Sequence, residues 1–149
     1  MENYLPITNW TERRCMSDKI FLDTNVLVYA FGSDSSKRII AENLLLREDI
    51  VMSSQVVGEF IAVTSRKQIL KPAEILLVSR NFLRTLPVVA VTGITVSLAL
   101  DVMTKYQFAY WDSLILAAAL ESHCTLVYSE DLQSGQRIED RLVIVDPFM

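Results

Sequence analysis

The stretch Lys19-Ile20-Phe21-Leu22-Asp23-Thr24-Asn25 decides the fold class of this chain. Its apolar run is typical of a short strand that is buried on both faces of a sheet. The polar trio that follows predicts a loop or the start of a helix directly after that strand. In open parallel sheets, sites form beyond the carboxyl ends of the strands, so Asp23 stands where a functional residue is expected.

The remainder of the chain alternates between short apolar runs and segments with helical spacing. Further strands are predicted at 50–52, 88–90, 125–128 and 142–145, and helices at 26–31, 37–48, 55–68, 72–86, 94–106 and 112–122. The polar residues 137–140 are predicted to be a loop. Continuous apolar strands that alternate with helices are typical of a parallel sheet covered on both faces. We therefore predict an α/β fold, a three-layer α/β/α sandwich with a central parallel sheet.

Composition limits the classes of protein that this chain can represent. Its 149 residues fit one domain, and 51% of them are hydrophobic, which is enough to build a core. Two cysteines are too few for a disulfide framework, and no apolar run reaches the roughly 18 residues needed to cross a membrane. We expect a cytoplasmic protein without a membrane partner. Residues 1–15 are polar and aperiodic, so we expect a poorly ordered extension before a domain at 16–149.

Four acidic residues are the candidates for chemistry. Asp23 and Asp131 each follow a predicted strand, and Asp112 begins an apolar helix whose positive end stabilises a carboxylate. Glu59 falls at the edge of the apolar stripe of its helix, where partial desolvation is expected. Each also has an ordinary role open to it: a turn residue, a helix cap or a surface ion pair. Together in one pocket, however, they would raise one another's pKa values, and a hard divalent cation would relieve that repulsion.

Other kinds of catalytic site find little support in this sequence. His123 is the only histidine, and no GxSxG motif or glycine-rich phosphate loop is present. The net charge of −4 gives no general attraction to nucleic acid, so RNA binding would need a local basic patch or a bound cation. The pattern therefore favours a cation held by carboxylates.

Five blocks of sequence resemble PIN-domain ribonucleases and, within them, the VapC-type toxins of toxin–antitoxin pairs. They are FLDTNVLVYA at 21–30, VVGEF at 56–60, YWDSLILAAAL at 110–120, LVYSEDLQSGQ at 126–136 and LVIVDPF at 142–148. The resemblance implies a metal-dependent endoribonuclease whose acids bind one or two Mg²⁺ or Mn²⁺ ions. The acidic positions of that family fall on Asp23, Glu59, Asp112 and Asp131. Either Glu130 or Asp131 fits the fourth position, and the Ser-x-Asp pattern favours Asp131.

The same resemblance implies supporting residues and partners. Thr24 and Ser129 fall where the family carries small hydroxyl residues near the metal, and Asn25 is expected to act as a structural cap. An RNA substrate, a homodimer and a cognate antitoxin are implied, with the antitoxin lying along an apolar groove beside helices 26–31 and 37–48. Basic residues are the candidates for binding the phosphates of the RNA backbone: Arg38, Arg66, Lys67, Lys71 and Arg137.

Three alternatives remain open at the level of sequence. A phosphotransferase with an aspartate nucleophile would use Asp23, but the position two residues on, where that chemistry needs a second aspartate, is Asn25. A receiver-like, Mg²⁺-binding regulatory module would also have an acidic pocket on a parallel sheet. The third alternative is a catalytically silent PIN-like scaffold.

Overall fold

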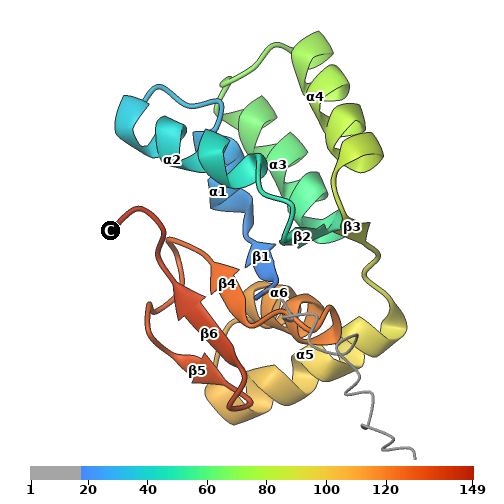
Figure 1. The fold of residues 1–149 in the computed structure, drawn as a ribbon. Helices are drawn as coiled ribbons and strands as arrows, with labels where there is room; N and C mark the ends of the chain where they lie inside the picture. The colour runs from blue at the N-terminus through green and yellow to red at the C-terminus, as the bar shows by residue number, and fades with distance from the viewer. Residues whose placement is uncertain (1–17) are drawn as a thin grey trace, which may run out of the picture.

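The computed structural model describes residues 18–149, so the predicted extension at 1–15 lies outside the described residues. Within that range, one sheet has the strand order β3-β2-β1-β4-β6-β5 (Figure 1). The strands are β1 (Ile20–Leu22), β2 (Ile50–Ser53), β3 (Val88–Val89), β4 (Leu126–Tyr128), β5 (Arg137–Ile138) and β6 (Leu142–Val145). All neighbouring pairs are parallel except β5 with β6.

Helices cover the sheet on two sides. They are α1 (Thr24–Tyr29), α2 (Ser35–Leu45), α3 (Ser54–Arg66), α4 (Pro72–Thr85), α5 (Gly93–Tyr106) and α6 (Tyr110–Glu121). Figure 1 shows α1 to α4 gathered on one side of the strands and α5 with α6 on the other. The predicted three-layer α/β/α sandwich is therefore confirmed, with a mostly parallel sheet. No helix within the described range is both long and apolar enough to cross a membrane.

The antiparallel edge strand β5 differs from the predicted loop at 137–140. Ile138 is fully buried, whereas Arg137 beside it is exposed. Glu139 and Asp140 both adopt positive φ, which turns the chain back into β6. A two-residue strand is too short to show an alternating pattern, so the sequence reads as a polar loop.

The strand order excludes a receiver-like sheet. In flavodoxin-like receiver domains, the first strand lies between the second and the third. Here β1 lies between β2 and β4, and β3 lies outside β2. The receiver-like alternative is therefore wrong for this chain.

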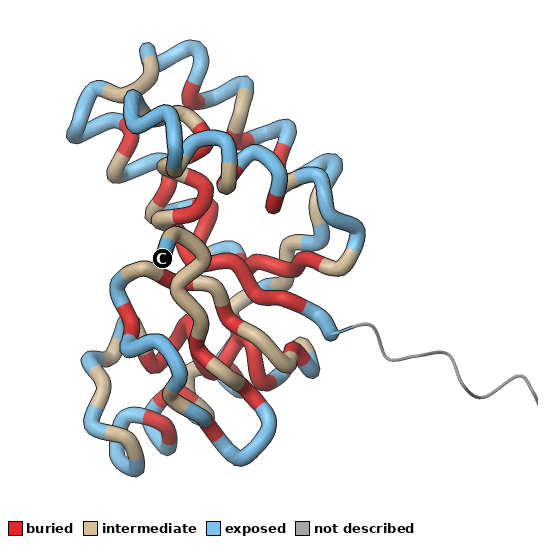
Figure 2. The backbone as a smooth tube through the Cα atoms, turned by 60° about the vertical axis from the view of Figure 1, so that its left-hand side comes forward, coloured by how far each residue is buried: buried red, intermediate tan, exposed pale blue. Residues whose placement is uncertain are grey.

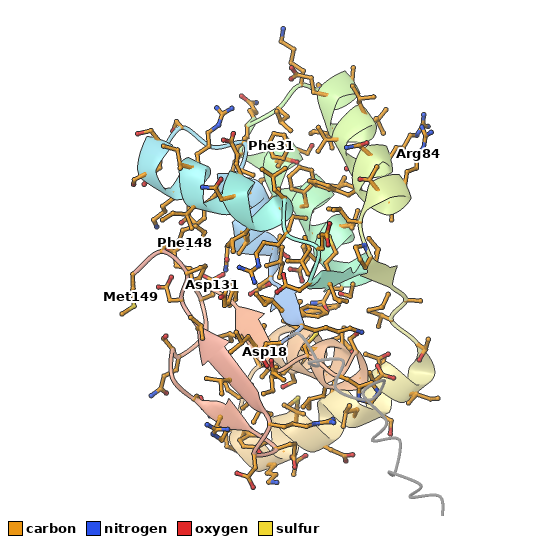
Figure 3. All side chains as sticks on the ribbon, viewed as in Figure 1. Asp18, Phe31, Arg84, Asp131, Phe148 and Met149 are labelled. Atoms are coloured by element: carbon orange, nitrogen blue, oxygen red, sulfur yellow. The ribbon has the colours of Figure 1, made fainter. Side chains whose placement is uncertain are left out.

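The core fixes the carboxyl ends of the central strands. All three residues of β1 are at most 2% exposed, and α6 is buried from Ser113 to Leu120 (Figure 2). On the other side, Phe60 of α3 packs on Phe31 and Phe82, with ring centroids 5.7 and 5.2 Å away. Figure 3 labels Phe31 among the side chains of the α1–α4 layer. Burial of this kind contributes about 1.5–3 kcal/mol for each large apolar side chain.

Five of the six helix starts differ from the predicted positions by one or two residues, and two of these differences concern candidate acids. Helix α1 begins at Thr24, with Asp23 as its N-cap, rather than at Val26. Helix α6 begins at Tyr110 rather than at Asp112. Asp112 therefore lies in the first helical turn and is not a cap, so the predicted start at this residue is wrong.

Candidate active site

The ends of β1 and β4 lie side by side at the centre of the sheet, where the strand order changes direction. Asp23 directly follows β1, and its amide donates to the Tyr128 carbonyl of β4 at 3.0 Å. Ser129 directly follows β4, and its amide donates to the Val145 carbonyl at 3.0 Å. A crevice at such a switch in strand order is the usual place for a site in an open α/β sheet.

Asp23 is the most buried of the four candidate acids, with only 7% of its surface exposed. Its Oδ1 accepts a hydrogen bond from the Thr24 amide at 2.7 Å, and its Oδ2 accepts one from the Ser129 hydroxyl at 2.7 Å. Burial raises the pKa of Asp23 from 3.8 to about 6; these two hydrogen bonds oppose the shift, and the charges of Glu59 and Asp131 add to it. The carboxylate is thus rigidly held and carries a charge that its surroundings do not fully compensate.

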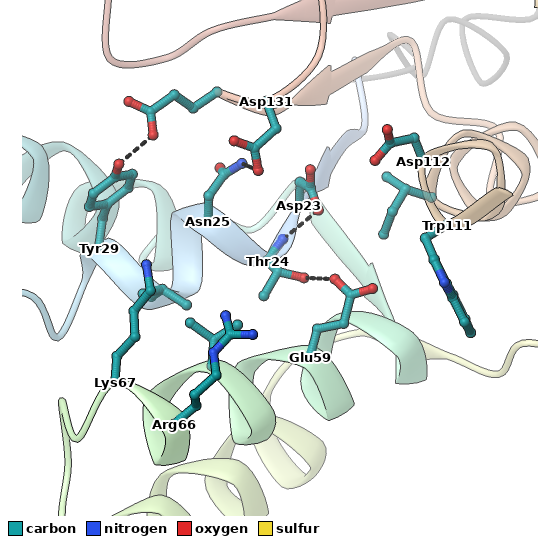
Figure 4. Close-up of a pocket in the computed structure, with 14 residues that line it drawn as sticks. Asp23, Thr24, Asn25, Tyr29, Glu59, Arg66, Lys67, Trp111, Asp112 and Asp131 are labelled. Carbon is teal, nitrogen blue, oxygen red and sulfur yellow. Dashed lines mark hydrogen bonds between the residues drawn. The ribbon is translucent and has the colours of Figure 1, made fainter. Parts of the chain in front are cut away.

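Glu59 reaches the same pocket from α3. Its Oε2 accepts a hydrogen bond from the Thr24 hydroxyl at 2.7 Å (Figure 4). Its Oε1 accepts one from Gln55 Nε2 at 2.8 Å. The side chain is partly buried, as its position on the helix predicted. No described lysine or arginine forms a salt bridge with it, so the surface ion pair that a lone helical glutamate often makes is absent from residues 18–149.

Gln55 is a site residue that the sequence alone did not single out. Besides its bond to Glu59, its Nε2 donates to the Trp111 carbonyl at 3.2 Å, which ties the start of α3 to the start of α6. The spacing of four residues between Gln55 and Glu59 on one helix face was the available signal. The contact with Trp111 has no such local signature, because 56 positions separate the two residues.

Asp112 and Asp131 reach the pocket from different elements: Asp112 from the first turn of α6 and Asp131 from the loop after β4. The pKa of Asp112 is raised, first by burial and then by the charges of Asp131 and Glu59. Asp131 is exposed, and its Oδ2 accepts a hydrogen bond from Asn25 Nδ2 at 3.2 Å. The predicted role of Asn25 as a cap is wrong, because Asp23 caps α1 and Asn25 lies within that helix; Asn25 instead orients one of the candidate acids.

Ser129 connects several of these groups through one hydroxyl. While its Oγ donates to Asp23, it accepts from the Asp131 amide at 3.2 Å and from Asn25 Nδ2 at 3.4 Å. The loop after β4 is thus bonded to the residue after β1. This arrangement explains why a small hydroxyl residue suits position 129.

Glu130, the rival for the fourth acidic position, has a different environment from Asp131. It lines the pocket, but its carboxylate binds Lys37 and accepts a hydrogen bond from the Tyr29 hydroxyl. Lys37 also lies 4.5 Å from the centroid of the Tyr29 ring. These contacts, the Lys37 bond foremost, lower the pKa of Glu130. Glu130 therefore has its own cationic partner, whereas Asp131 faces the other carboxylates.

The candidate acids share one cavity of about 330 Å³ (Figure 4). Arg66 and Lys67 lie at one end of this acidic pocket and Trp111 at the other. Of the five basic candidates, only these two line the pocket; Arg38, for example, pairs with Glu42 of its own helix at 2.8 Å. The lining residues are Asp23, Thr24, Asn25, Val28, Tyr29, Glu59, Val63, Arg66, Lys67, Trp111, Asp112, Ile115, Glu130 and Asp131.

The donor set of this pocket suits a hard cation that keeps most of its water. Oxygen atoms dominate it, and Asn25 Oδ1 is buried without a hydrogen-bond partner among the described residues. Within residues 18–149, no three Asp, Glu, His or Cys side chains are arranged to hold a metal together. Mg²⁺ is usually bound through only one or two carboxylates and several waters, so this spacing is compatible with it.

Comparison with solved structures finds the same fold in several proteins. One is VapC20 of Mycobacterium tuberculosis, described as a sarcin–ricin loop cleaving toxin (15% identity, TM-score 0.61, covering 76% of this chain and 92% of that one). A toxin–antitoxin complex from Klebsiella pneumoniae is similar at 16% identity and TM-score 0.65, covering 87% and 98%. VapBC2 of Rickettsia felis, bound to a DNA fragment from its promoter, is similar at 21% identity and TM-score 0.60, covering 85% and 98%.

Comparison at the level of sequence gives a family assignment. None of the curated proteins compared with this chain matches it. The family model of the PIN domain matches residues 20–136, a range that includes all four candidate acids. Since this match covers most of the chain, and the resemblance drawn from the five sequence blocks points the same way, the protein belongs to the PIN-domain family.

Proposed function

We propose that this PIN-domain protein is a divalent-metal-dependent endoribonuclease. The observation that carries the proposal is the pocket itself: Asp23, Glu59, Asp112 and Asp131 line one cavity, and within the described range none of them forms a salt bridge. Uncompensated carboxylates are costly to keep together unless a cation joins them. A bound Mg²⁺ or Mn²⁺ would supply a water of lowered pKa and neutralise charge on a phosphate.

In this proposal, the acidic side chains of the pocket have two roles: three bind the cation and one accepts a proton. Asp23, Glu59 and Asp131 would hold the cation, one or two of them directly and the rest through its bound waters, and each is already oriented by a hydrogen bond from Thr24, Ser129, Gln55 or Asn25. Asp112 accepts no side-chain hydrogen bond from the described residues, and its raised pKa makes it a better base. We propose that Asp112 accepts the proton of the attacking water. The oxygen of that water bonds to phosphorus while the P–O bond to the leaving nucleotide breaks.

We further propose that the nuclease is the toxin of a toxin–antitoxin pair, as in the similar structures from K. pneumoniae and R. felis. A second cavity of about 390 Å³ shares Val28, Tyr29 and Lys67 with the acidic pocket and extends along α1 to Phe31. An antitoxin peptide lying there could extend a basic side chain into the acids. The α1 residues fit the predicted groove, whereas helix α2 contributes only its N-cap, Asp34, rather than residues 37–48.

Metal-dependent cleavage of RNA tests the proposed chemistry. Purified protein is incubated with single-stranded and structured RNA in Mn²⁺ or in EDTA, and Asp23→Asn, Asp112→Asn, Asp131→Asn and Glu130→Gln are compared. The three aspartate variants should lose at least about a hundredfold in rate, whereas Glu130→Gln should stay within a few-fold of the parent. Asp101→Asn is the matched control, because Asp101 is an exposed aspartate on α5. Cleavage that persists in EDTA or in Asp23→Asn contradicts the mechanism.

The partners are tested separately from the chemistry. Co-expression with the neighbouring small open reading frame should yield a complex that no longer cleaves RNA. Size-exclusion chromatography with light scattering should report a homodimer for the protein alone. A nuclease that stays monomeric and recovers no partner would retain the catalytic proposal but lose the toxin assignment.

A further inference from the structure

Trp111 is exposed at the rim of the acidic pocket. Its side chain is 63% exposed although tryptophan carries one of the largest apolar surfaces, and it lines the cavity. Figure 4 shows the indole beside Asp112 and Glu59, at the end of the pocket opposite Arg66 and Lys67. An exposed tryptophan contributes little to the stability of the fold, and at the rim of the pocket its surface is available to a ligand that enters the cavity.

The backbone that carries the indole is held firmly. Its carbonyl accepts the hydrogen bond from Gln55, the same side chain that orients Glu59. The Tyr110 ring packs on the indole edge to face, with centroids 5.1 Å apart and planes at 67°. The contact with Tyr110 restricts the indole while much of its surface stays open to solvent.

We propose that Trp111 is a stacking platform for an unpaired RNA base next to the scissile phosphate, an inference that rests on the proposed ribonuclease function. Bases of single-stranded nucleic acids stack on aromatic side chains, and any base can do so because each has a π-face. The phosphate to be cleaved would lie at the acids, and a neighbouring phosphate would lie near Arg66 and Lys67. A base in a duplex would first have to unpair and unstack, which costs free energy that an unpaired base does not spend. Trp111 therefore favours unpaired segments of RNA.

Binding of a defined probe tests the platform independently of cleavage. Asp23→Asn prevents turnover, and in this background we compare Trp111→Ala and Trp111→Phe, using a fluorescein-labelled oligoadenylate of about ten nucleotides in Mg²⁺. We expect Trp111→Ala to weaken binding by between about fivefold and a hundredfold, and Trp111→Phe to restore most of it. An abasic oligomer of the same length should bind all three proteins alike. Leu77→Ala, which removes a side chain of similar exposure (72%) from α4, should have no effect.

Fluorescence of the indole gives a second readout that a structural role would not change. The chain has two tryptophans, and Trp10→Phe leaves Trp111 as the only one. Oligoadenylate should quench its emission, and the abasic oligomer should not. The proposed stacking role is wrong if Trp111→Ala binds RNA as tightly as the parent, including the case in which the substitution converts a dimer to a monomer. Either result leaves the nuclease assignment standing. A wild-type protein that neither binds nor cleaves RNA overturns both.

Discussion

The hydroxyl of Ser129 and the carboxylate of Asp23 form the best-defined contact of the site. Their 2.7 Å hydrogen bond joins residues that are 106 positions apart and directly follow adjacent strands. Asp23 is nevertheless buried at a cost, because desolvation opposes its ionised form more than these bonds favour it. The residue best placed for a cation is therefore a source of instability when no cation is bound.

The raised pKa of Asp23 predicts how the metal-free protein responds to pH. In the folded state this pKa is about 6, against an ordinary value of 3.8, so between these values the native state binds more protons than the unfolded state. Stability should therefore fall as pH rises through this window, by roughly 3 kcal/mol, and stay low at neutral pH. Asp23→Asn should remove the penalty and stabilise the protein in EDTA by about 1–3 kcal/mol near pH 7.

Urea unfolding in EDTA at two pH values measures this effect. The advantage of Asp23→Asn over wild type should vanish at about pH 4, where both side chains are uncharged. Adding Mn²⁺ should raise the melting temperature of the wild type more than that of the variant, because a ligand stabilises the state that binds it. The exposed Asp101→Asn should show neither change. A variant less stable than wild type at neutral pH in EDTA would contradict the assignment of Asp23 as a strained carboxylate.

At the scale of helices and strands, the elements with strong periodicity or clear boundaries were predictable. Helix α4, for example, begins at Pro72, as the predicted range 72–86 has it. The start of α6 was not predicted, because its N-cap is Ala109, which has no side chain able to signal a helix start. Strand β5 has two residues, too few for any pattern.

The candidate site, too, was predictable from the sequence only in part. The sequence blocks contain the four candidate acids, and the structure brings these acids to one cavity. Gln55 and the Lys37–Glu130 pair were not predicted, because their contacts join residues far apart in the chain and depend on the packing of α2, α3 and α6. Local periodicity indicates which face of a helix is buried, but it does not say what that face meets.

Packing within the α1–α4 layer gives a prediction about stability. Phe60 is fully buried against Phe31 and Phe82, so Phe60→Ala should cost about 3–5 kcal/mol of unfolding free energy. Its neighbour on the same helix, Ile61, is 40% exposed, and Ile61→Ala should cost clearly less. Urea denaturation of the two variants makes the comparison. Equal losses would mean that the aromatic cluster is not what joins α3 to α4.

At the scale of the whole molecule, the proposed function requires an acidic protein to bind an acidic polymer. The net charge is −4, so long-range attraction to RNA is absent. Next to the acidic pocket, the cations available for RNA are Arg66 and Lys67, neither of which forms a salt bridge with another described residue. RNA affinity should consequently depend only weakly on salt.

The slope of RNA affinity against salt concentration depends on the number of phosphate contacts. Two phosphate contacts to single-stranded RNA predict a slope of about −1.4 for the logarithm of affinity against that of monovalent salt, and Arg66→Ala should reduce it by about 0.7. The titration uses Asp23→Asn at constant Mg²⁺, with Arg84→Ala, an exposed arginine of α4, as the control. A slope several times steeper would mean that basic residues elsewhere on the surface bind the RNA.

The neighbouring positions of β1 and β4 have a consequence for the synthesis of the protein. The four acids stand at positions 23, 59, 112 and 131, and the last of them reaches Asp23 only when β4 has paired with β1. A nascent chain on the ribosome therefore carries no assembled site until most of its length has been translated and has left the exit tunnel. For the proposed nuclease, this order of assembly would keep the site incomplete while the chain is still attached to the ribosome. A prematurely terminated product that ends before Asp131 would lack one of the four acids.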